Sequence, residues 1–405
     1  GEQRRGIMGQ SYRRDGDRLM PVGQAASGSP VGILWAGGAF FVTLLALGAF
    51  VVAPSASAKP QSAPPPFVAT LLPGGKQAQT RQLIPPVYGQ ITLGAYAGEA
   101  ALMAGVTSSS TRAFADPKTY GTYRDAVREV YGVDLEDMNY FSLERTELQA
   151  RIKDLGQYLL LAGEYGDVTI ALEPLGPEKY AVFEDKEVMG WLRTEFQRAE
   201  KAGITVWVRF ASEQNLRGSK YSAAGGRTKA LKFYNAAAAF RAAMPTNVKM
   251  VFSPLLNTAY TGRATQDQIL AWNYRGATEN NPNTLWDRIG GTIYRTNLEL
   301  VPMYHDYYGF MTSLDPNTDF QICEIGGPYR SKQETLDFLA MAAQGEWPKL
   351  RKVNLFARDI NTRADPEGHF GFVEPNLRQA AIQQVKKTGK AQLAESFLKP
   401  VLQAN

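Results

Sequence analysis

The sequence predicts an α/β fold, a (β/α)8 (TIM) barrel preceded by a single transmembrane helix and a proline-rich linker. Three observations support this prediction. An apolar run occupies residues 31–53, a proline-rich stretch follows it to residue 90, and residues 91–405 alternate short apolar runs with longer amphipathic ones. Such alternation is typical of βα units around a parallel sheet. One barrel takes ~250 residues, so the C-terminal region is long enough to hold one.

The apolar run Val31–Ala53 carries no charge. At 1.5 Å per residue, a helix of this length crosses a hydrocarbon core of roughly 30 Å. Residues 1–30 are rich in arginine, and the next charge after the run is Lys59. Because basic residues flank membrane spans on the cytoplasmic side, residues 1–30 are predicted to be a cytoplasmic tail. The sequence ASA at 56–58 is similar to a cleavage site, so a cleaved signal peptide is the alternative; the length of the run favours an uncleaved anchor.

Residues 54–90 form the predicted linker. They combine many prolines with serine, alanine and glycine. Such a composition favours extended, semi-rigid conformations, so the linker is expected to hold the domain at 91–405 away from the bilayer.

Composition excludes several classes of partner. The net charge of +5 comes from 44 basic and 39 acidic side chains, which is too even a balance for a nucleic-acid-binding protein. Cys323 is the only cysteine, so the chain has no internal disulfide. With His305 and His369 as the only histidines, a His-rich metal site is not expected, and we predict neither a metal nor a cofactor.

Eight runs are candidates for the barrel strands, of which the second is the weakest. They are 91–97, 137–143, 168–173, 205–210, 248–253, 288–294, 320–325 and 353–358. Helices are predicted between them, most clearly at 186–202, 227–243 and 332–343. An open doubly wound sheet is the alternative, but no glycine-rich phosphate loop follows the first strand.

Two glutamates follow or close predicted strands. Glu213 comes after TVWVRFAS, and Glu324 ends the run FQICE. In a (β/α)8 barrel the functional residues lie just past the C-terminal ends of the strands. The two are 111 positions apart, or three βα units of about 37 residues, which places them on strands four and seven.

The motifs around these glutamates resemble glycoside hydrolase family 26, the β-mannanase family of retaining glycosidases. VRFASEQN at 208–215 is similar to the strand-four motif of the family, and ICEIGG at 322–327 to its strand-seven motif. LGAYAG at strand one, FSPLLN at strand five and WDRIGGTIYR at strand six follow in the family's order. The resemblance covers roughly residues 91–375.

The resemblance implies a role for three residues. Glu213 matches the general acid/base, Glu324 the nucleophile, and Tyr294 the aromatic residue that hydrogen-bonds the nucleophile. Retaining hydrolysis needs one protonated and one ionised carboxyl about 5–5.5 Å apart. Arg209, on the same strand as Glu213, is expected to hold Glu324 ionised, while the nearness of the two acids raises the pKa of Glu213.

Three further residues complete the predicted site. Asn215, Trp272 and Trp286 are expected to bind substrate or support the site, the two tryptophans by lining a cleft before strand six. The family has a histidine directly before its acid/base glutamate, where it helps to bind the sugar beside the cleavage point. This chain has Ser212 there, which changes the expected substrate binding.

Two functions follow from these features. The first, which Ser212 favours, is an accessory or structural subunit of a membrane protein complex, anchored through residues 1–90 and built on a glycosidase-like barrel. In architecture alone this is similar to single-span accessory subunits of bacterial photosynthetic complexes, which implies a bacterial inner membrane with the barrel in the periplasm or outside the cell. The second is an active retaining β-mannanase-type hydrolase that binds envelope or extracellular polysaccharide in the barrel mouth.

Overall fold

The computed structural model describes residues 4–5, 11–15, 18–21 and 87–388, with gaps at 107–110, 145, 177–178, 217–218, 257–262, 277, 279, 295–298, 328–330 and 360–368. The chain divides into two units, residues 1–22 with 83–405, and residues 23–82. The second unit, with the predicted membrane span at 31–53 and most of the predicted linker, lies outside the described residues. Within the described part of the chain, no helix combines the length and apolarity needed to cross a membrane.

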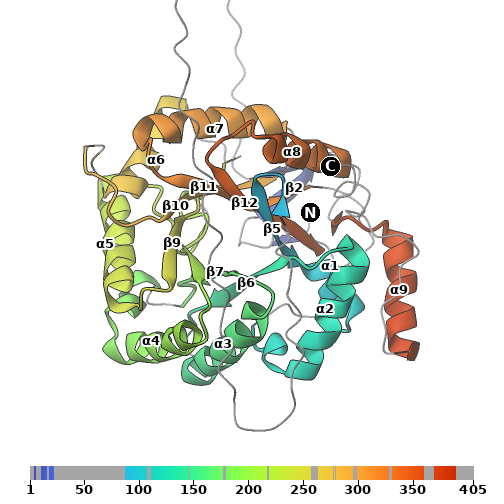
Figure 1. The fold of residues 1–405 in the computed structure, drawn as a ribbon. Coiled ribbons are helices and arrows are strands. Elements are labelled where there is room, and N and C mark those ends of the chain that lie inside the picture. The colour runs from blue at the N-terminus through green and yellow to red at the C-terminus, as the bar shows by residue number, and fades with distance from the viewer. Residues whose placement is uncertain are drawn as a thin grey trace, which may run out of the picture. The chain divides into compact units, whose positions relative to one another are not determined.

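Eight parallel strands close into a barrel. They are β5 (Ile91–Ala97), β6 (Glu136–Ser142), β7 (Val168–Glu173), β8 (Val206–Phe210), β9 (Val248–Phe252), β10 (Arg288–Tyr294), β11 (Asp319–Gly326) and β12 (Leu350–Asp359). Each strand pairs with the next, and β12 pairs with β5 to complete the circle (Figure 1). The predicted barrel is therefore confirmed, including its weakest strand, and the open-sheet alternative is wrong.

Two short strands extend the sheet. β4 (Val87–Tyr88) pairs antiparallel with the start of β5, and β13 (His369–Phe370) pairs antiparallel with the end of β12. β4 thus occupies residues that the sequence assigned to the end of the linker.

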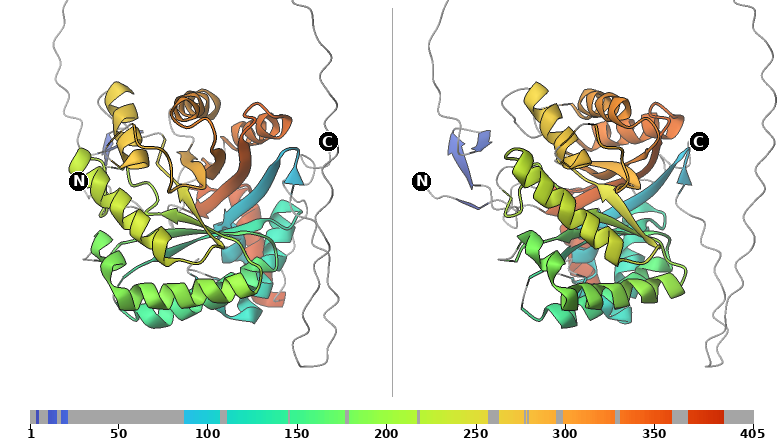
Figure 2. Two further views of the ribbon diagram at one scale, coloured as in Figure 1. Left: turned by 60° about the vertical axis from the view of Figure 1, so that its left-hand side comes forward. Right: turned by 90° about the vertical axis from the view of Figure 1, so that its left-hand side faces the viewer.

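Helices surround the strands (Figures 1 and 2). They are α1 (Gly98–Met103), α2 (Pro117–Tyr131), α3 (Leu148–Gly163), α4 (Lys186–Lys201), α5 (Arg227–Ala243), α6 (Arg263–Arg275), α7 (Leu300–Leu314), α8 (Lys332–Gln344) and α9 (Pro375–Thr388), with 3-10 turns η1 (Ala113–Ala115) and η2 (Lys179–Glu184). The three helices predicted most clearly, α4, α5 and α8, have the expected bounds to within one residue.

Residues near the N-terminus, in the predicted cytoplasmic tail, form a small antiparallel sheet. Its strands are β1 (Arg4–Arg5), β2 (Ser11–Asp15) and β3 (Arg18–Pro21). No secondary structure was predicted from the sequence of this segment.

Local signals in the sequence set the helix ends. Asp116 caps α2 by accepting a hydrogen bond from the backbone N–H of Thr119, and Pro117 occupies the first turn, where its missing N–H costs nothing. Gly132 ends the helix in the left-handed conformation, at φ 75°, which glycine adopts without steric cost.

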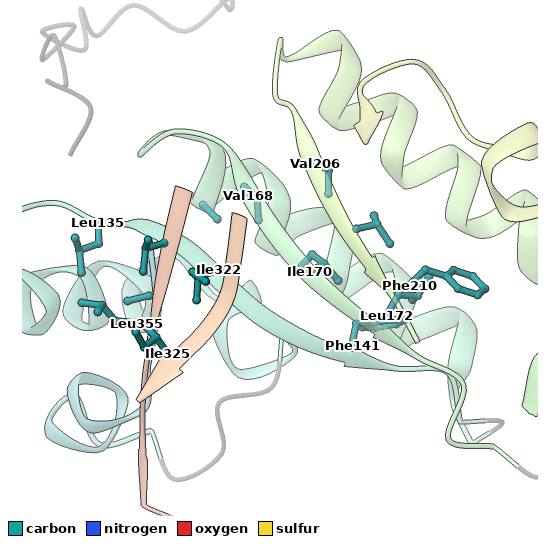
Figure 3. Close-up of a cluster of buried hydrophobic side chains, with 14 of the residues drawn as sticks. Leu135, Phe141, Val168, Ile170, Leu172, Val206, Phe210, Ile322, Ile325 and Leu355 are labelled. Carbon is teal, nitrogen blue, oxygen red and sulfur yellow. The ribbon is translucent and has the colours of Figure 1, made fainter. Parts of the chain in front are cut away.

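The strands separate an apolar outer face from a polar interior. Along β7, Val168, Ile170 and Leu172 belong to the hydrophobic core that includes side chains of the surrounding helices, and Figure 3 shows them in line along the strand. The alternate residue Thr169 instead accepts a hydrogen bond from Lys352 Nζ of β12, on the barrel's inner side. Because both faces of the strand are buried, its sequence is apolar with little alternation.

The interior is tightly filled beside β10. A Cβ added at Gly290 would lie 2.4 Å from Cys323 Sγ and 2.6 Å from the carbonyl oxygen of Phe252. A glycine at this position therefore allows β9, β10 and β11 to approach one another.

Candidate active site

Glu324 enters the barrel interior because β11 carries a bulge. Gly291 of β10 pairs with Ile322, but the next residue, Thr292, pairs with Glu324. Ile322 and Ile325, three positions apart, both belong to the hydrophobic core outside the strands. Strict alternation would place residues of one face two apart, so the extra residue in β11 is what lets Glu324 face inward while Ile325 stays in the core.

Three side chains from other strands contact the Glu324 carboxylate. Arg209 of β8 forms an ion pair with it, and both side chains are fully buried. Tyr140 of β6 and Tyr294 of β10 each donate a hydrogen bond, to Oε1 and Oε2 respectively. The expected contacts of Arg209 and Tyr294 are thus present. Tyr140 was not among the predicted site residues, because its strand was the least distinct of the eight in the sequence.

The Arg209 guanidinium is itself held by neighbouring strands. Its Nε donates to Ser253 Oγ just after β9 at 3.0 Å, and its Nη2 donates to Thr292 Oγ1 of β10 at 3.1 Å. Met138 Sδ of β6 lies 3.4 Å from Nη1. With these contacts the guanidinium has little freedom to move, so it provides a fixed positive charge beside Glu324.

Glu213 lies in a strained turn after β8. Ala211 and Glu213 both have left-handed backbones, at φ 47° and 57°, which non-glycine residues rarely adopt. Two backbone bonds hold the turn, from Ala211 N to the Leu172 carbonyl at 2.8 Å and from Glu213 N to the Ser253 carbonyl at 2.7 Å. Strain of this kind persists only where tertiary contacts fix it, and it is frequent at functional sites.

The Glu213 carboxyl is suited to carry a proton. The side chain is 2% exposed, and its Oε1 has no hydrogen-bond partner among the described residues. Burial raises the pKa of Glu213 well above its ordinary value, the charges of Glu324 and Glu173 raise it further, and Arg209 opposes them. Two carboxyls in one buried site therefore differ in character: Glu324 is paired with a cation, while Glu213 favours the neutral acid.

A third carboxylate, that of Glu173, lies beside this turn. It ends β7 and accepts a hydrogen bond from Ser212 Oγ at 2.9 Å. Glu173 was not among the predicted site residues, although it closes the run VTIALE just as Glu324 closes FQICE. Its position at a strand end was the signal that could have found it.

An aromatic cluster adjoins Glu324. Tyr96 of β5, Met138 of β6 and Phe356 of β12 pack together, with Tyr140 and Tyr294 against them. The rings of Tyr96 and Phe356 stack at 5.3 Å. Burial raises the pKa of Tyr96 to about 12, so its hydroxyl stays neutral. The cluster shields the charged group from solvent.

Asn215 has a supporting position. Its Nδ2 donates to the Leu255 carbonyl at 2.7 Å, and its Oδ1 accepts from Leu255 N at 2.8 Å. Both ends of the amide are thus bound to one backbone unit, which ties the turn after β8 to the segment after β9.

The two predicted cleft tryptophans lie in other surroundings. Trp286 is 4% exposed, stacks on Phe233 at 5.7 Å and donates from Nε1 to the Tyr274 carbonyl at 2.9 Å. The prediction that it lines a cleft is wrong, because it precedes β10 and so lies at the opposite end of that strand from the carboxylates. Trp272 is half-buried on α6, and the Arg227 guanidinium lies 5.3 Å over its ring.

The described part of the chain contains no cluster of three or more His, Cys, Asp or Glu side chains that could hold a metal ion.

Comparison with known proteins yields similar solved structures only. No protein-family model matches the sequence, and no curated protein matches it either. The GH26A protein of a Muricauda species is 12% identical, with 69% of this chain and 88% of that one covered, at a TM-score of 0.43. A GH26 β-mannanase from Bacteroides ovatus is 13% identical, with 67% and 85% covered, at a TM-score of 0.44. The catalytic domain of a GH26 endo-β-1,4-mannanase from a Bacillus species is 13% identical, with 76% and 88% covered, at 0.46. At these identities the similarity concerns the arrangement of strands and helices, which the strand pairing already establishes.

Proposed function

We propose that the barrel is a retaining glycoside hydrolase that acts on β-linked, mannan-type polysaccharides. The observation that carries this proposal is the contrast between the two carboxyls. Glu324 is bound by Arg209 and two tyrosines, whereas Glu213 is buried and its Oε1 meets no hydrogen-bond partner in the part of the chain that the structure describes. A retaining glycosidase needs this division into one ionised nucleophile and one protonated acid. The substrate class rests on the ordered motifs of strands one, four, five, six and seven.

The proposed reaction has two steps. In the first, a Glu324 oxygen bonds to the anomeric carbon while the glycosidic bond breaks and Glu213 gives its proton to the leaving oxygen. In the second, Glu213 takes a proton from water, the water oxygen bonds to the anomeric carbon, and Glu324 is released as a carboxylate. Arg209 and the two tyrosines stabilise that carboxylate at the start and end of the cycle.

Ser212 alters sugar binding in this scheme. Its hydroxyl donates to Glu173 and so is occupied within the protein. A histidine at this place reaches the sugar beside the cleavage point in the family that the motifs resemble. We therefore expect a high KM for mannan oligosaccharides rather than a loss of the chemical step.

The test uses the full chain in detergent with β-mannan oligosaccharides and an aryl β-mannoside that has an activated leaving group. Glu324→Gln is expected to lower hydrolysis of both by orders of magnitude, because the nucleophile has no substitute. Glu213→Gln is expected to slow the oligosaccharides much more than the aryl mannoside, since only the former need protonation. The matched control is Glu164→Gln, an exposed acid after α3 at the N-terminal end of β7, which should hydrolyse both at the wild-type rate. Wild-type protein without Glu324-dependent hydrolysis would refute the proposal.

We propose as a second candidate that the protein is an anchored accessory subunit of a bacterial membrane complex. The uncharged run Val31–Ala53, with basic residues before it and a proline-rich stretch after it, favours this role. Its anchor would lie in the inner membrane with residues 1–30 in the cytoplasm and the barrel outside. Replacing the run should then release the barrel from the membrane fraction and from co-purifying proteins, whereas Glu213→Gln and Glu324→Gln should leave assembly unchanged.

The orientation has its own test. Protease added to right-side-out vesicles should cut within residues 60–86 and leave residues 1–30 protected. Loss of the tail with protection of the barrel would contradict the orientation.

A further inference from the structure

Glu173 and Tyr221 together hold the residue before the proposed acid. Glu173 Oε1 accepts a hydrogen bond from the Ser212 hydroxyl at 2.9 Å, and the Tyr221 hydroxyl donates to the Ser212 carbonyl at 2.9 Å while its oxygen lies 3.3 Å from Glu173 Oε1. Tyr221 is fixed in turn, because its own carbonyl accepts a hydrogen bond from Tyr180 at 2.5 Å. Ser212 is therefore restrained at both its side chain and its backbone.

This restraint acts on the strained part of the chain. Ser212 lies between Ala211 and Glu213, the two residues with left-handed backbones. Each such conformation costs on the order of 1–3 kcal/mol, so a turn of this kind relaxes unless its surroundings hold it. The contacts of Glu173 and Tyr221 with Ser212 supply part of that hold, and the direction in which Glu213 points depends on it.

We propose that Glu173 is a positioning residue for Glu213, which holds the turn at Ser212 and places a third acidic charge beside the two proposed catalytic carboxyls. The inference deepens the proposed function and rests on it for its catalytic meaning. The three side chains lie close together whether or not the protein hydrolyses a substrate.

The charges support the same role. All three acids are nearly or fully buried, at 9% exposure for Glu173, 2% for Glu213 and 0% for Glu324, with Arg209 as the cation among them. An ionised Glu173 disfavours ionisation of Glu213 and so raises its pKa, in the same direction as burial and Glu324. Burial also raises the pKa of Glu173 itself, while the Ser212 hydrogen bond and Arg209 oppose that rise. A purely structural hydrogen-bond acceptor at this position would not affect the titration of Glu213.

Glu173→Gln separates these two possibilities. The glutamine keeps a side-chain oxygen that can accept from Ser212, but it removes the charge. In the full chain in detergent, with ¹³C-labelled glutamate carboxyls and the Glu213 signal assigned by its loss in Glu213→Gln, the pKa of Glu213 should fall by on the order of one unit. Glu164→Gln is the matched control and should leave that pKa unchanged. An unchanged Glu213 pKa in folded Glu173→Gln would overturn the proposal.

Ser212→Ala tests the restraint separately and replaces the first variant if Glu173→Gln does not fold. It leaves the charge in place and removes the hydroxyl, so the turn should loosen and the Glu213 carboxyl should titrate closer to an ordinary glutamate. Ser212→Thr keeps the hydroxyl and should restore the wild-type titration. If Ser212→Ala titrates like the wild type, the positioning role is wrong.

The titration of Glu213 and the hydrolysis assay test the positioning role and the proposed function separately. A shift of the Glu213 pKa without any hydrolysis by the wild type would support the positioning role and refute the glycosidase. Glu324-dependent hydrolysis with no shift would do the reverse. If both hold, the descending alkaline limb of kcat/KM against pH should move to lower pH in Glu173→Gln.

Discussion

Arg209 of β8 and Glu324 of β11 form an ion pair in which both side chains are fully buried, three strands apart around the barrel. Removing two charges from water costs several kcal/mol per ion, which good geometry and further hydrogen bonds must offset. Ser253 and Thr292 bind the arginine, while Tyr140 and Tyr294 bind the carboxylate. Removal of either partner would therefore leave the other charge buried without its counter-charge.

Arg209→Met is expected to destabilise the barrel by about 3–5 kcal/mol, because it leaves the Glu324 charge buried without its cation. Denaturant unfolding of the full chain measures this. The matched control is Arg112→Met, which removes salt bridges to Glu147 and Asp154 from a side chain that is 60% exposed. Because solvent screens exposed pairs, this variant should lose far less stability than Arg209→Met. Similar losses in both would show that the buried pair has no special role.

The pH dependence of stability should carry a contribution from Glu213. The pKa of Glu213 is raised in the folded state, so the protonated carboxyl stabilises the fold. This contribution to the free energy of unfolding is fully present below the ordinary glutamate value of 4.5 and is lost as the pH rises through the folded pKa. Between these two pKa values, each rise of one pH unit lowers the free energy of unfolding of the wild type by about 1.4 kcal/mol relative to that of Glu213→Gln. Urea unfolding at pH 5 and pH 8 should therefore show the variant gaining stability over the wild type at the higher pH. An equal difference at both values would contradict the raised pKa.

Tyr140→Phe and Tyr294→Phe each remove one hydrogen bond to the Glu324 carboxylate. Hydrogen bonds to charged groups contribute about 1.5–3 kcal/mol, so each variant should lower the free energy of unfolding by about that amount, measured by denaturant unfolding of the full chain. The loss in the double variant should differ from the sum of the two single losses, since both tyrosines bind one carboxylate. Tyr304→Phe is the control: its buried hydroxyl has no hydrogen-bond partner among the described residues, so its loss should be neutral or stabilising.

Gly290→Ala tests the close approach of the strands. The new methyl would meet Cys323 Sγ and the Phe252 carbonyl, so we expect a loss of about 1–3 kcal/mol in the free energy of unfolding. Gly190→Ala in α4 places its methyl in open space and should stabilise by up to about 1 kcal/mol through helix propensity. The opposite signs of the two effects make the comparison decisive; a neutral Gly290→Ala would mean that the strands can move apart.

The strand order could be predicted from the sequence because a strand that is buried on both faces has a short, continuous apolar sequence, which few other elements have. VTIALE and RIGGTIY were placed to the residue, and the positions of Glu213 and Glu324 followed from counting βα units. The second strand, EDMNYFS, was the least distinct because polar residues on both of its faces interrupt the apolar run: Glu136 binds Lys352 inside the barrel, and Asp137 binds Arg124 of α2 outside it. Tyr140 was missed for the same reason.

The sequence by itself determined the barrel, its two central glutamates and the residues Arg209 and Tyr294 beside them, since these depend on periodicity and on motif order. Only the tertiary structure decided that Glu173 and Tyr140 join the group, that a bulge turns Glu324 inward, and that Trp286 is core rather than cleft. Each of these depends on which way a side chain points from a strand end or a turn. That direction is set by pairing register, by a left-handed backbone and by contacts between residues far apart in the chain. None of these can be read from a short stretch of sequence.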